Sequence, residues 1–416
     1  MIVVVVDAIS TGVDLSLALI ERGCLCIQVC SKVVYRQDNI SFLKTLVVEA
    51  PQALDKAISE DFFDNVDMVV AGSEPGVTLA DEIASKLSIP YANDSKTTEL
   101  RRNKFKAQER LAEMDVRSIH QRLISEFSDV GKYDIQFPVV VKPINSGASD
   151  GVSLCLDDEA FEHSVMKNLG KTNILGHINS ELLIQDYIEG VQYFVNTISW
   201  DGDVYTTDVW KTYRRKVPGA MFIFEGMKLC DPTSPEVKRL IEYNNRVLSE
   251  LGLKFGAAHN EIIIDKHGPV LVESNARLMG ASINDSAFKA AIDNTQVELL
   301  VDVYLNKGFG EDRRIYQMSK SLAEISLVFE KTGVLEAFSA KDSVCDLDSF
   351  YCLSGIPEIG SKVSKTNDTI GHAGFIYLVN DNPDQLDKDF NYVLDLVKKD
   401  QIYKILESKN KEQILC

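Results

Sequence analysis

The sequence predicts an α/β architecture for the N-terminal part of the chain and an α+β architecture for the remainder. Residues 1–95 alternate short apolar strands with helical patterns, which implies a parallel sheet with right-handed crossovers. Farther along, a buried strand at residues 137–142 runs into a loop of small residues, and an apolar β-hairpin with two acids lies within residues 256–280. A chain of 416 residues is long enough for two or three domains with their own cores.

The N-terminal pattern begins with a strand at residues 2–6 and a helix at 13–22 that ends at Gly23. The turn between them, residues 10–12, is too short for a dinucleotide fingerprint, so NAD binding is not expected. The other expected elements are strands at 24–30, 68–71, 322–329 and 374–378, and helices at 78–87, 103–114, 236–251, 333–338 and 385–400.

The hairpin carries the strongest chemical signal. Its strands, residues 261–265 and 269–273, are joined by a turn at 266–268, so Glu261 and Glu273 are expected side by side. Two such carboxylates repel unless a cation lies between them. Oxygen ligands on a rigid hairpin suit Mg²⁺ that is also bound by phosphate oxygens. The alternative, a surface hairpin with two solvated glutamates, is disfavoured by the apolar Ile-Ile-Ile and Val-Leu-Val runs.

The strand at residues 137–142 (FPVVVK) ends in Lys142, and Pro143 is expected to stop it. The small residues at 145–151 would let backbone N–H groups close around phosphates, with the lysine as a point charge. The lysine precedes the glycines and no G-K-[ST] follows, so this is not a Walker A loop. A plain strand–turn–strand remains the alternative, but the two-glutamate hairpin later in the chain favours a nucleotide site.

Composition excludes several function classes. The net charge of -18 argues against a general nucleic-acid or anionic-membrane surface, so neither partner is expected. No apolar run is long enough for a transmembrane helix. The segment MIVVVVDAIS lacks a basic n-region and reads as a strand rather than a signal peptide, so a cytoplasmic location is expected.

The eight cysteines match no zinc pattern. Cys24, Cys26 and Cys30 alternate with apolar residues in CLCIQVC, so a strand would place all three on one face. We interpret them as small, reduced apolar residues.

The chain resembles the ATP-grasp superfamily and, within it, the carboxylate–amine ligases that act on amino acids (L-amino-acid, or dipeptide, ligases). The matching segments, in chain order, are VVVDAISTGVDLSLALIERG, VAGSEPGVTLADEIASKLSIP, RRNKFKAQERLAE, FPVVVKPINSGASDGV, LLIQDYIEGVQYFVNTIS, VYTTDVWKTYRR and the hairpin ending in ESNARLMG. Together they span nearly the whole chain, and their order and spacing fit as well as their letters.

This resemblance implies an ATP-grasp fold with an N-terminal α/β domain at 1–95, an ATP-grasp domain at 96–315 and a C-terminal α+β region at 316–416. Within the central domain, the small lobe is expected at about 139–188 and the large lobe at about 189–315. The implied activity joins an amino acid to an amine, which is expected to be another amino acid. The reaction would pass through an acyl phosphate and release ADP and phosphate. The alternatives are a purine-biosynthesis or biotin-carboxylase-like ligase, and a non-catalytic ATP-binding regulator. Related enzymes are often dimers, which leaves a homodimer open.

The resemblance also implies contacts with ATP. Lys104 and Lys142 would reach the phosphates, although Lys104 could instead be a solvated helix lysine. The Asp186 carbonyl and the Ile188 N–H would read adenine. Many relatives have acids where this chain has Gln185 and Gln192. The acid at the position of Gln192 binds the ribose hydroxyls in those relatives, so the ribose contact of this chain departs from the pattern. Glu189 is an alternative ribose ligand. The remaining implied contacts are Ser146, Gly147, Ala148 and Ser149 in the lid, and Tyr187 in the adenine segment.

The implied metal ligands are Glu261, Glu273 and Asn275, for Mg²⁺ or alternatively Mn²⁺. Lys142 and Arg277 would be catalytic, with Arg277 facing the acyl phosphate unless it is a structural salt-bridge residue. A guanidinium there could lower the barrier by about 3–4 kcal/mol, judged from single oxyanion donors.

Substrate contacts are implied with more alternatives. Glu74 would pair with a substrate amine or act as a helix cap or surface residue. His259 would touch a substrate carboxylate or be a hydrogen-bonded core histidine, and Arg214 lies near the substrate cleft or at a solvated strand end. Further lining residues implied are Met279, Gly280 and Ser282.

Overall fold

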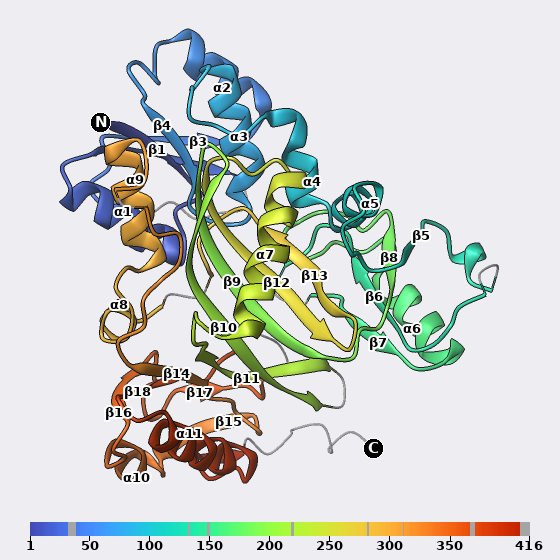
Figure 1. Ribbon diagram of the computed structural model, residues 1–416. Coiled ribbons are helices and arrows are strands. Elements are labelled where there is room, and N and C mark those ends of the chain that lie inside the picture. The colour runs from blue at the N-terminus through green and yellow to red at the C-terminus, as the bar shows by residue number, and fades with distance from the viewer. Residues whose placement is uncertain are drawn as a thin grey trace.

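The computed structural model describes residues 1–31, 39–131, 134–147, 150–217, 220–280, 283–310, 312–366 and 371–407 (Figure 1). Its N-terminal part is a four-stranded parallel sheet in the order β3-β2-β1-β4, which confirms the predicted parallel α/β architecture. The central strand β1 is almost fully buried, as expected for a parallel sheet covered by helices on both faces. The elements are β1 (Ile2–Val6), α1 (Thr11–Glu21), β2 (Leu25–Ser31), β3 (Lys44–Val48), α2 (Pro51–Ser59), β4 (Met68–Ala71) and α3 (Gly76–Lys86).

A helical connection joins this sheet to the rest of the chain. It comprises η1 (Ser95–Thr97), α4 (Thr98–Arg102) and α5 (Lys104–Glu113). The Asn103 side chain caps α5 by accepting hydrogen bonds from the N–H groups of Phe105 (3.0 Å) and Lys106 (3.1 Å). One turn on, the Gln108 amide donates to the Leu271 carbonyl at 2.8 Å. The cap fixes the start of α5, and the Gln108 contact holds the helix against the two-glutamate hairpin.

The small lobe is a four-stranded antiparallel sheet in the order β5-β8-β6-β7 with one helix. Pro143 was predicted to stop the strand that ends at Lys142. In the structure it is instead the last residue of that strand and pairs with Leu182. The proline is tolerated because the neighbouring strand β7 pairs only as far as Val141. The elements are β5 (Gln121–Ile124), η2 (Phe127–Asp129), β6 (Val139–Pro143), β7 (Ser153–Cys155), α6 (Asp158–Asn168) and β8 (Leu182–Asp186).

An eight-stranded antiparallel sheet, β13-β12-β9-β10-β11-β14-β18-β16, forms the centre of the molecule (Figure 1). Helix α7 packs on it through an apolar stripe that includes Val237, Leu240 and Val247. Helix α9 lies beside α1 and shares a core with the N-terminal sheet. The elements are β9 (Val191–Trp200), β10 (Asp203–Val217), β11 (Ala220–Leu229), α7 (Pro235–Glu250), β12 (Gly256–Asp265), β13 (Gly268–Asn275), α8 (Asp285–Lys289) and α9 (Gln296–Asn306).

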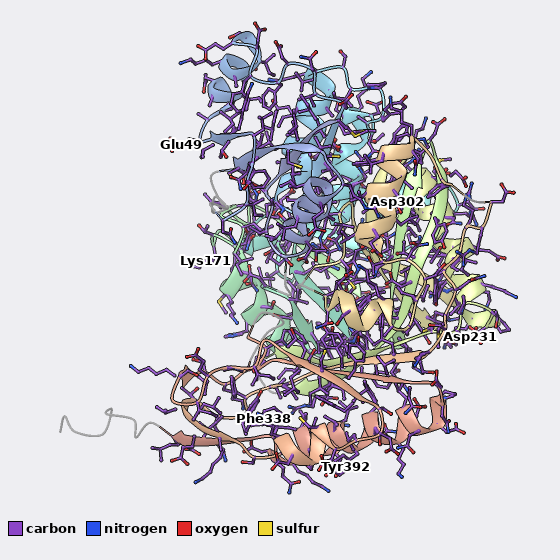
Figure 2. The ribbon with its side chains drawn as sticks, turned by 90° about the vertical axis from the view of Figure 1, so that its left-hand side faces the viewer. Glu49, Lys171, Asp231, Asp302, Phe338 and Tyr392 are labelled. Atoms are coloured by element: carbon purple, nitrogen blue, oxygen red, sulfur yellow. The ribbon has the colours of Figure 1, made fainter. Side chains whose placement is uncertain are left out.

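The C-terminal part extends the same sheet and adds a second, three-stranded one, β17-β15-β19. Figure 2 shows this layer at the bottom of the molecule, with Phe338 on β15 and Tyr392 on α11. The elements are β14 (Ser321–Ser326), β15 (Gly333–Phe338), α10 (Lys341–Cys345), β16 (Phe350–Ser354), β17 (Lys362–Val363), β18 (Phe375–Asn380), α11 (Pro383–Lys398) and β19 (Tyr403–Glu407).

The helix predicted at residues 333–338 is wrong, because these residues form strand β15. β15 pairs with β17 and with β19, whose residues follow much later in the chain. A β-carbon on Gly333 would lie 2.2 Å from the Leu406 carbonyl oxygen, so this glycine permits the close approach of β19. Long-range pairing therefore overrides the local helical pattern.

Among the described residues, no helix has the length and apolar character needed to span a bilayer. Cys24, Cys26 and Cys30 are buried and carry no disulfide, in agreement with their interpretation as small apolar residues.

Candidate active site

The two-glutamate hairpin is formed by β12 and β13. Its register places Glu261 opposite Glu273 and His259 opposite Asn275. Side chains two residues apart on a strand point to the same face, so these two cross-strand pairs are neighbours on one face. The strands are longer than predicted, and Asp265 pairs with Gly268, so the turn contains two residues rather than three.

The two glutamates meet different partners. Glu273 Oε1 forms an ion pair with Lys104 Nζ at 2.7 Å, whereas Glu261 Oε2 accepts a hydrogen bond from Gln192 Nε2 at 2.6 Å. Burial and then the Glu273 charge raise the pKa of Glu261 to about 7. Arg214, Lys142 and Lys104 favour the Glu261 charge but do not outweigh burial and Glu273, so a divalent cation bound by both acids would stabilise the charged pair.

Two lysines approach these acids. Besides Glu273, Lys104 Nζ donates to the Ser146 carbonyl at 2.8 Å. Lys142 is 5% exposed, and burial followed by repulsion from Lys104 lowers its pKa to about 8. Ammonium groups held close together and away from water favour an anion, as a polyphosphate would be.

The predicted phosphate loop follows β6. Ser146 is buried and its hydroxyl donates to Asp150 Oδ2 at 2.8 Å, while the Gly147 carbonyl accepts from the Asp150 N–H at 3.0 Å. These bonds hold the two ends of the loop together beside Lys104. The predicted contacts Ala148 and Ser149 lie outside the described residues.

The predicted adenine segment lies at the end of β8. The Asp186 N–H donates to the His120 carbonyl and the Tyr187 N–H to the Pro138 carbonyl, each at 3.1 Å. Gln185 is buried and donates to Gln121 Oε1 at 3.2 Å, within the small-lobe sheet. The contacts of the Asp186 carbonyl and Ile188 with adenine stay predictions.

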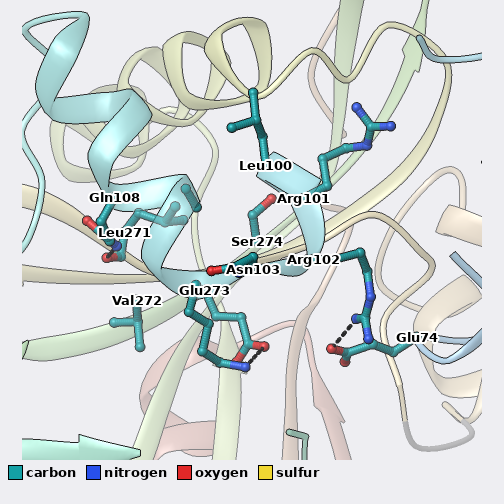
Figure 3. A pocket seen from close by; sticks show the side chains of 12 residues that line it. Glu74, Leu100, Arg101, Arg102, Asn103, Gln108, Leu271, Val272, Glu273 and Ser274 are labelled. Atoms are coloured by element: carbon teal, nitrogen blue, oxygen red, sulfur yellow. Dashed lines mark hydrogen bonds and ion pairs between the residues drawn. The ribbon is translucent and has the colours of Figure 1, made fainter. Parts of the chain in front are cut away.

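Glu74, on the loop after β4, binds a cluster of donors from other elements. Arg102 Nη1 donates to Glu74 Oε1 at 2.7 Å (Figure 3), and Arg277 Nη2 lies 3.3 Å from Oε2. With its nitrogen toward Glu74, the Asn275 amide donates to both carboxylate oxygens at 2.8 and 3.2 Å, which leaves its own oxygen available to a metal. Burial disfavours the Glu74 charge, but Arg277, Arg102 and Lys104 outweigh it and lower the pKa to about 2.

His259 is buried, and its Nδ1 lies 2.8 Å from Asn196 Oδ1. Burial and then the nearby Arg277 charge lower the pKa of His259 well below its usual value. Burial also lowers the pKa of Arg214, while Glu261 opposes that shift, so Arg214 lies near the acid pair. Arg214 stacks over the Phe222 ring at 4.6 Å.

The segment after Arg277 is tied to the N-terminal domain. The Met279 N–H donates to Gln296 Oε1 at 2.8 Å, and the Thr11 hydroxyl donates to the Met279 carbonyl at 2.6 Å. A β-carbon on Gly280 would lie 3.2 Å from Arg277 Nη1, so a side chain there would crowd the guanidinium. The predicted residue Ser282 lies outside the described residues.

Comparison with known proteins agrees with this geometry. Residues 135–285 match the ATP-grasp domain family model. The chain contains an ATP-grasp domain and has an ATP-grasp fold. It is 27% identical over 395 residues to dapdiamide A synthase of Enterobacter agglomerans, covering 92% of each chain. Its fold is similar to an L-amino acid ligase from Bacillus licheniformis (TM-score 0.79, 18% identity, 98% and 99% of the two chains). It is also similar to phosphoribosylglycinamide synthetase from Anaerococcus prevotii (TM-score 0.67, 14% identity, 98% and 99% coverage).

The structure also reveals three site residues that the sequence reasoning missed. Arg102 reaches Glu74, and Asn196 and Asp208 lie behind His259. Arg102 could have been found from the basic run RRNKFK that ends in Lys104. Asp208 stands out as an acid within the buried segment VYTTDVW, but no local signal indicates Asn196.

Proposed function

We propose that this protein is a carboxylate–amine ligase that joins an amino acid to an amine, which we expect to be a second amino acid, and releases ADP and phosphate. The observation that carries the proposal is the acid pair Glu261–Glu273 with Lys104 and Lys142 beside it and Arg277 just beyond. This arrangement offers cation ligands, phosphate ligands and a fixed positive charge side by side. An acyl-phosphate reaction needs all three.

Glu261, Glu273 and the Asn275 oxygen would hold Mg²⁺ or Mn²⁺. The fit rests on the donor set, which is all oxygen, and on the two acids that lie directly opposite each other on the hairpin. The ion would neutralise the charge of the β- and γ-phosphates. Lys104 and Lys142 would bind the phosphate oxygens as the γ-phosphoryl group passes to the carboxylate.

Arg277 would bind the oxygen that becomes negative when the amine attacks the acyl carbon. One such donor lowers the barrier by about 3–4 kcal/mol. Its guanidinium is already oriented by Glu74 and by its own bond to the Leu278 carbonyl at 2.9 Å, so it needs little reorganisation.

The choice of amino-acid substrates is supported by the dapdiamide A synthase relative, which matches across nearly the whole chain. The similarity to phosphoribosylglycinamide synthetase keeps another ATP-grasp ligation reaction as the second candidate. Both would release ADP. The proposal also includes the domain boundaries at residues 95 and 315, the ATP contacts and a cytoplasmic location.

The test is a phosphate-release screen over pairs of the twenty amino acids, with product masses measured. A carboxyl-¹⁸O amino acid should then transfer one labelled oxygen to inorganic phosphate. Label in AMP, with release of pyrophosphate, would contradict the acyl-phosphate route. Phosphate release that requires glycine together with a phosphoribosyl amine, and no second amino acid, would favour the second candidate.

A further inference from the structure

A row of phenylalanine rings crosses the middle of the eight-stranded sheet beside the acid pair. Strands β12, β9, β10 and β11 are neighbours in this sheet (Figure 1). Phe194 on β9 lies directly opposite Glu261 on β12. Its ring stacks against that of Phe224 on β11, with the centroids 5.9 Å apart and the planes inclined by 27°. The two rings therefore cover part of β10, which runs between their strands.

The row lies on the same face of the sheet as the candidate active site. Tyr193, the residue before Phe194, points to the opposite face, where its hydroxyl donates to Glu236 at the start of α7 at 2.5 Å. Successive side chains of a strand alternate between the two faces, so Phe194 faces away from α7. On that side the centroid of the His259 ring lies 4.9 Å from that of Phe194. The phenylalanines thus adjoin the residues of the site.

Both rings are partly exposed although they belong to inner strands of the sheet. Phe222, which is also partly exposed, lies two residues from Phe224 on β11, and the Arg214 guanidinium stacks over its ring at 4.6 Å. We call Phe194, Phe222 and Phe224 the aromatic floor. Its edges are charged, with Glu261 on one side and Arg214 on the other. An apolar surface with a few polar groups around it is typical of a site that binds a small molecule.

An amino acid fits both parts of this surface, because it joins a charged head to a side chain. In the proposed reaction its carboxylate lies between the metal at Glu261 and the guanidinium of Arg277. Cross-strand neighbours have Cβ atoms about 4.5–5.5 Å apart, so a side chain that extends from this point toward β9 lies over Phe194. An apolar side chain in that position removes the rings from water, whereas a charged side chain would lose its own hydration.

Adenine is the other flat ligand that the proposed reaction brings to the site. The segment predicted to bind it, residues 186–188, precedes the start of β9 at Val191. Phe194 instead lies within the strand, opposite Glu261. The aromatic floor is thus displaced from the adenine segment toward the proposed metal ligands, which favours the amino acid as its occupant.

We propose that the aromatic floor binds the side chain of the amino acid whose carboxylate is phosphorylated, and that it selects large apolar side chains such as those of leucine and phenylalanine. This inference rests on the proposed ligase function and adds a substrate class to it. Phe194 and Phe224 then set the preference among carboxylate substrates and leave the binding of ATP unchanged.

Hydroxylamine isolates the carboxylate substrate, because with excess hydroxylamine as the amine a single amino acid must be the one that is phosphorylated. Hydroxamate formation would be measured with L-alanine, L-leucine, L-phenylalanine and L-aspartate. In the wild type, kcat/KM for leucine or phenylalanine should exceed that for alanine and for aspartate by at least about 10-fold, the effect of burying a few methylene groups. Phe194→Ala and Phe224→Ala should each reduce this preference by about 10-fold, while kcat/KM for alanine and KM for ATP stay within about threefold of wild type.

The matched control is Phe127→Ala, because Phe127 is 47% exposed and lies on η2 in the small lobe. This variant should keep the wild-type preference. Phe194→Leu retains an apolar side chain and should keep most of the preference, so it tests the floor even if an alanine variant folds poorly.

A wild-type preference for alanine or aspartate would overturn the inference, as would an unchanged preference in both alanine variants. A raised KM for ATP without a change in preference would assign the floor to adenine instead. A change confined to the attacking amino acid in dipeptide formation would assign it to the amine, and either result would overturn the inference while the ligase function stands. Absence of hydroxamate with each of the twenty amino acids would contradict the proposed function, and this inference with it.

Discussion

Lys104 Nζ lies 2.7 Å from Glu273 Oε1, so a lysine at the start of α5 neutralises one of the two hairpin acids. The same ammonium contacts the Ser146 carbonyl of the phosphate loop at 2.8 Å. One side chain thus links the helical connection, the large lobe and the small lobe. Binding of a cation at Glu273 would release Lys104 toward the phosphates, because the two positive charges compete for one carboxylate.

The first prediction concerns this acid. Glu273→Gln removes one negative ligand while keeping the side-chain shape, so turnover should fall by at least about 100-fold and the Mg²⁺ concentration for half-maximal rate should rise. Steady-state rates over a Mg²⁺ series would measure both. Glu99→Gln is the control, because Glu99 is exposed and pairs with the exposed Lys106. A Glu273 variant that matches this control would contradict the metal assignment.

The second prediction concerns Lys142. Lys142→Met should weaken ATP binding about 10–100-fold, since a charge-assisted hydrogen bond contributes about 1.5–3 kcal/mol. Calorimetric titration with a non-hydrolysable ATP analogue would measure the affinity. Lys106→Met, at an exposed site on α5, should bind ATP as the wild type does. Equal affinities in the two variants would remove Lys142 from the phosphate site.

A third prediction follows from Glu74, whose pKa is lowered to about 2 despite burial because Arg277, Arg102 and Lys104 favour its charge. A depressed carboxylate pKa stabilises the fold above the unfolded pKa, and this contribution is lost as the pH falls toward 2. The shift corresponds to about 3 kcal/mol. Glu74→Gln should therefore lower the free energy of unfolding at pH 7, and the difference from wild type should shrink between pH 4.5 and pH 2. Denaturant titrations across that range would show a constant difference if the ion pairs contribute nothing.

Glu324 leads to the opposite pH dependence. It is buried in β14, and burial raises its pKa to about 7 although the Tyr377 hydroxyl donates to it at 2.8 Å. A raised carboxylate pKa means that the folded state binds more protons, so stability falls as the pH rises from 4.5 to 7. Glu324→Gln keeps an acceptor for Tyr377 and should stabilise the protein by about 3 kcal/mol at pH 8, but not at pH 4.5. Thermal melting at the two pH values would test this, and equal effects at both would contradict it.

Much of the candidate site could be predicted because its signals are local. Glu261 and Glu273 lie on one short hairpin, and Lys142 ends a strand that leads directly into the loop of small residues. Hairpin register and strand alternation depend on neighbouring residues, so the amino-acid sequence alone is sufficient to infer them. The secondary structure at residues 333–338 could not be inferred in this way, because its partner strand β19 lies far along the chain.

The sequence by itself determined the parallel N-terminal sheet, the two-glutamate hairpin and the chemistry that these residue types can perform. Only the tertiary structure decided which charges meet. Arg102 and Arg277 converge on Glu74 from distant segments, and Asn196 lies between Asp208 and His259 in a buried hydrogen-bonded chain. Hydrogen-bond direction and charge pairing depend on distances of a few ångströms between segments that are far apart in the chain, and folding alone brings these segments together.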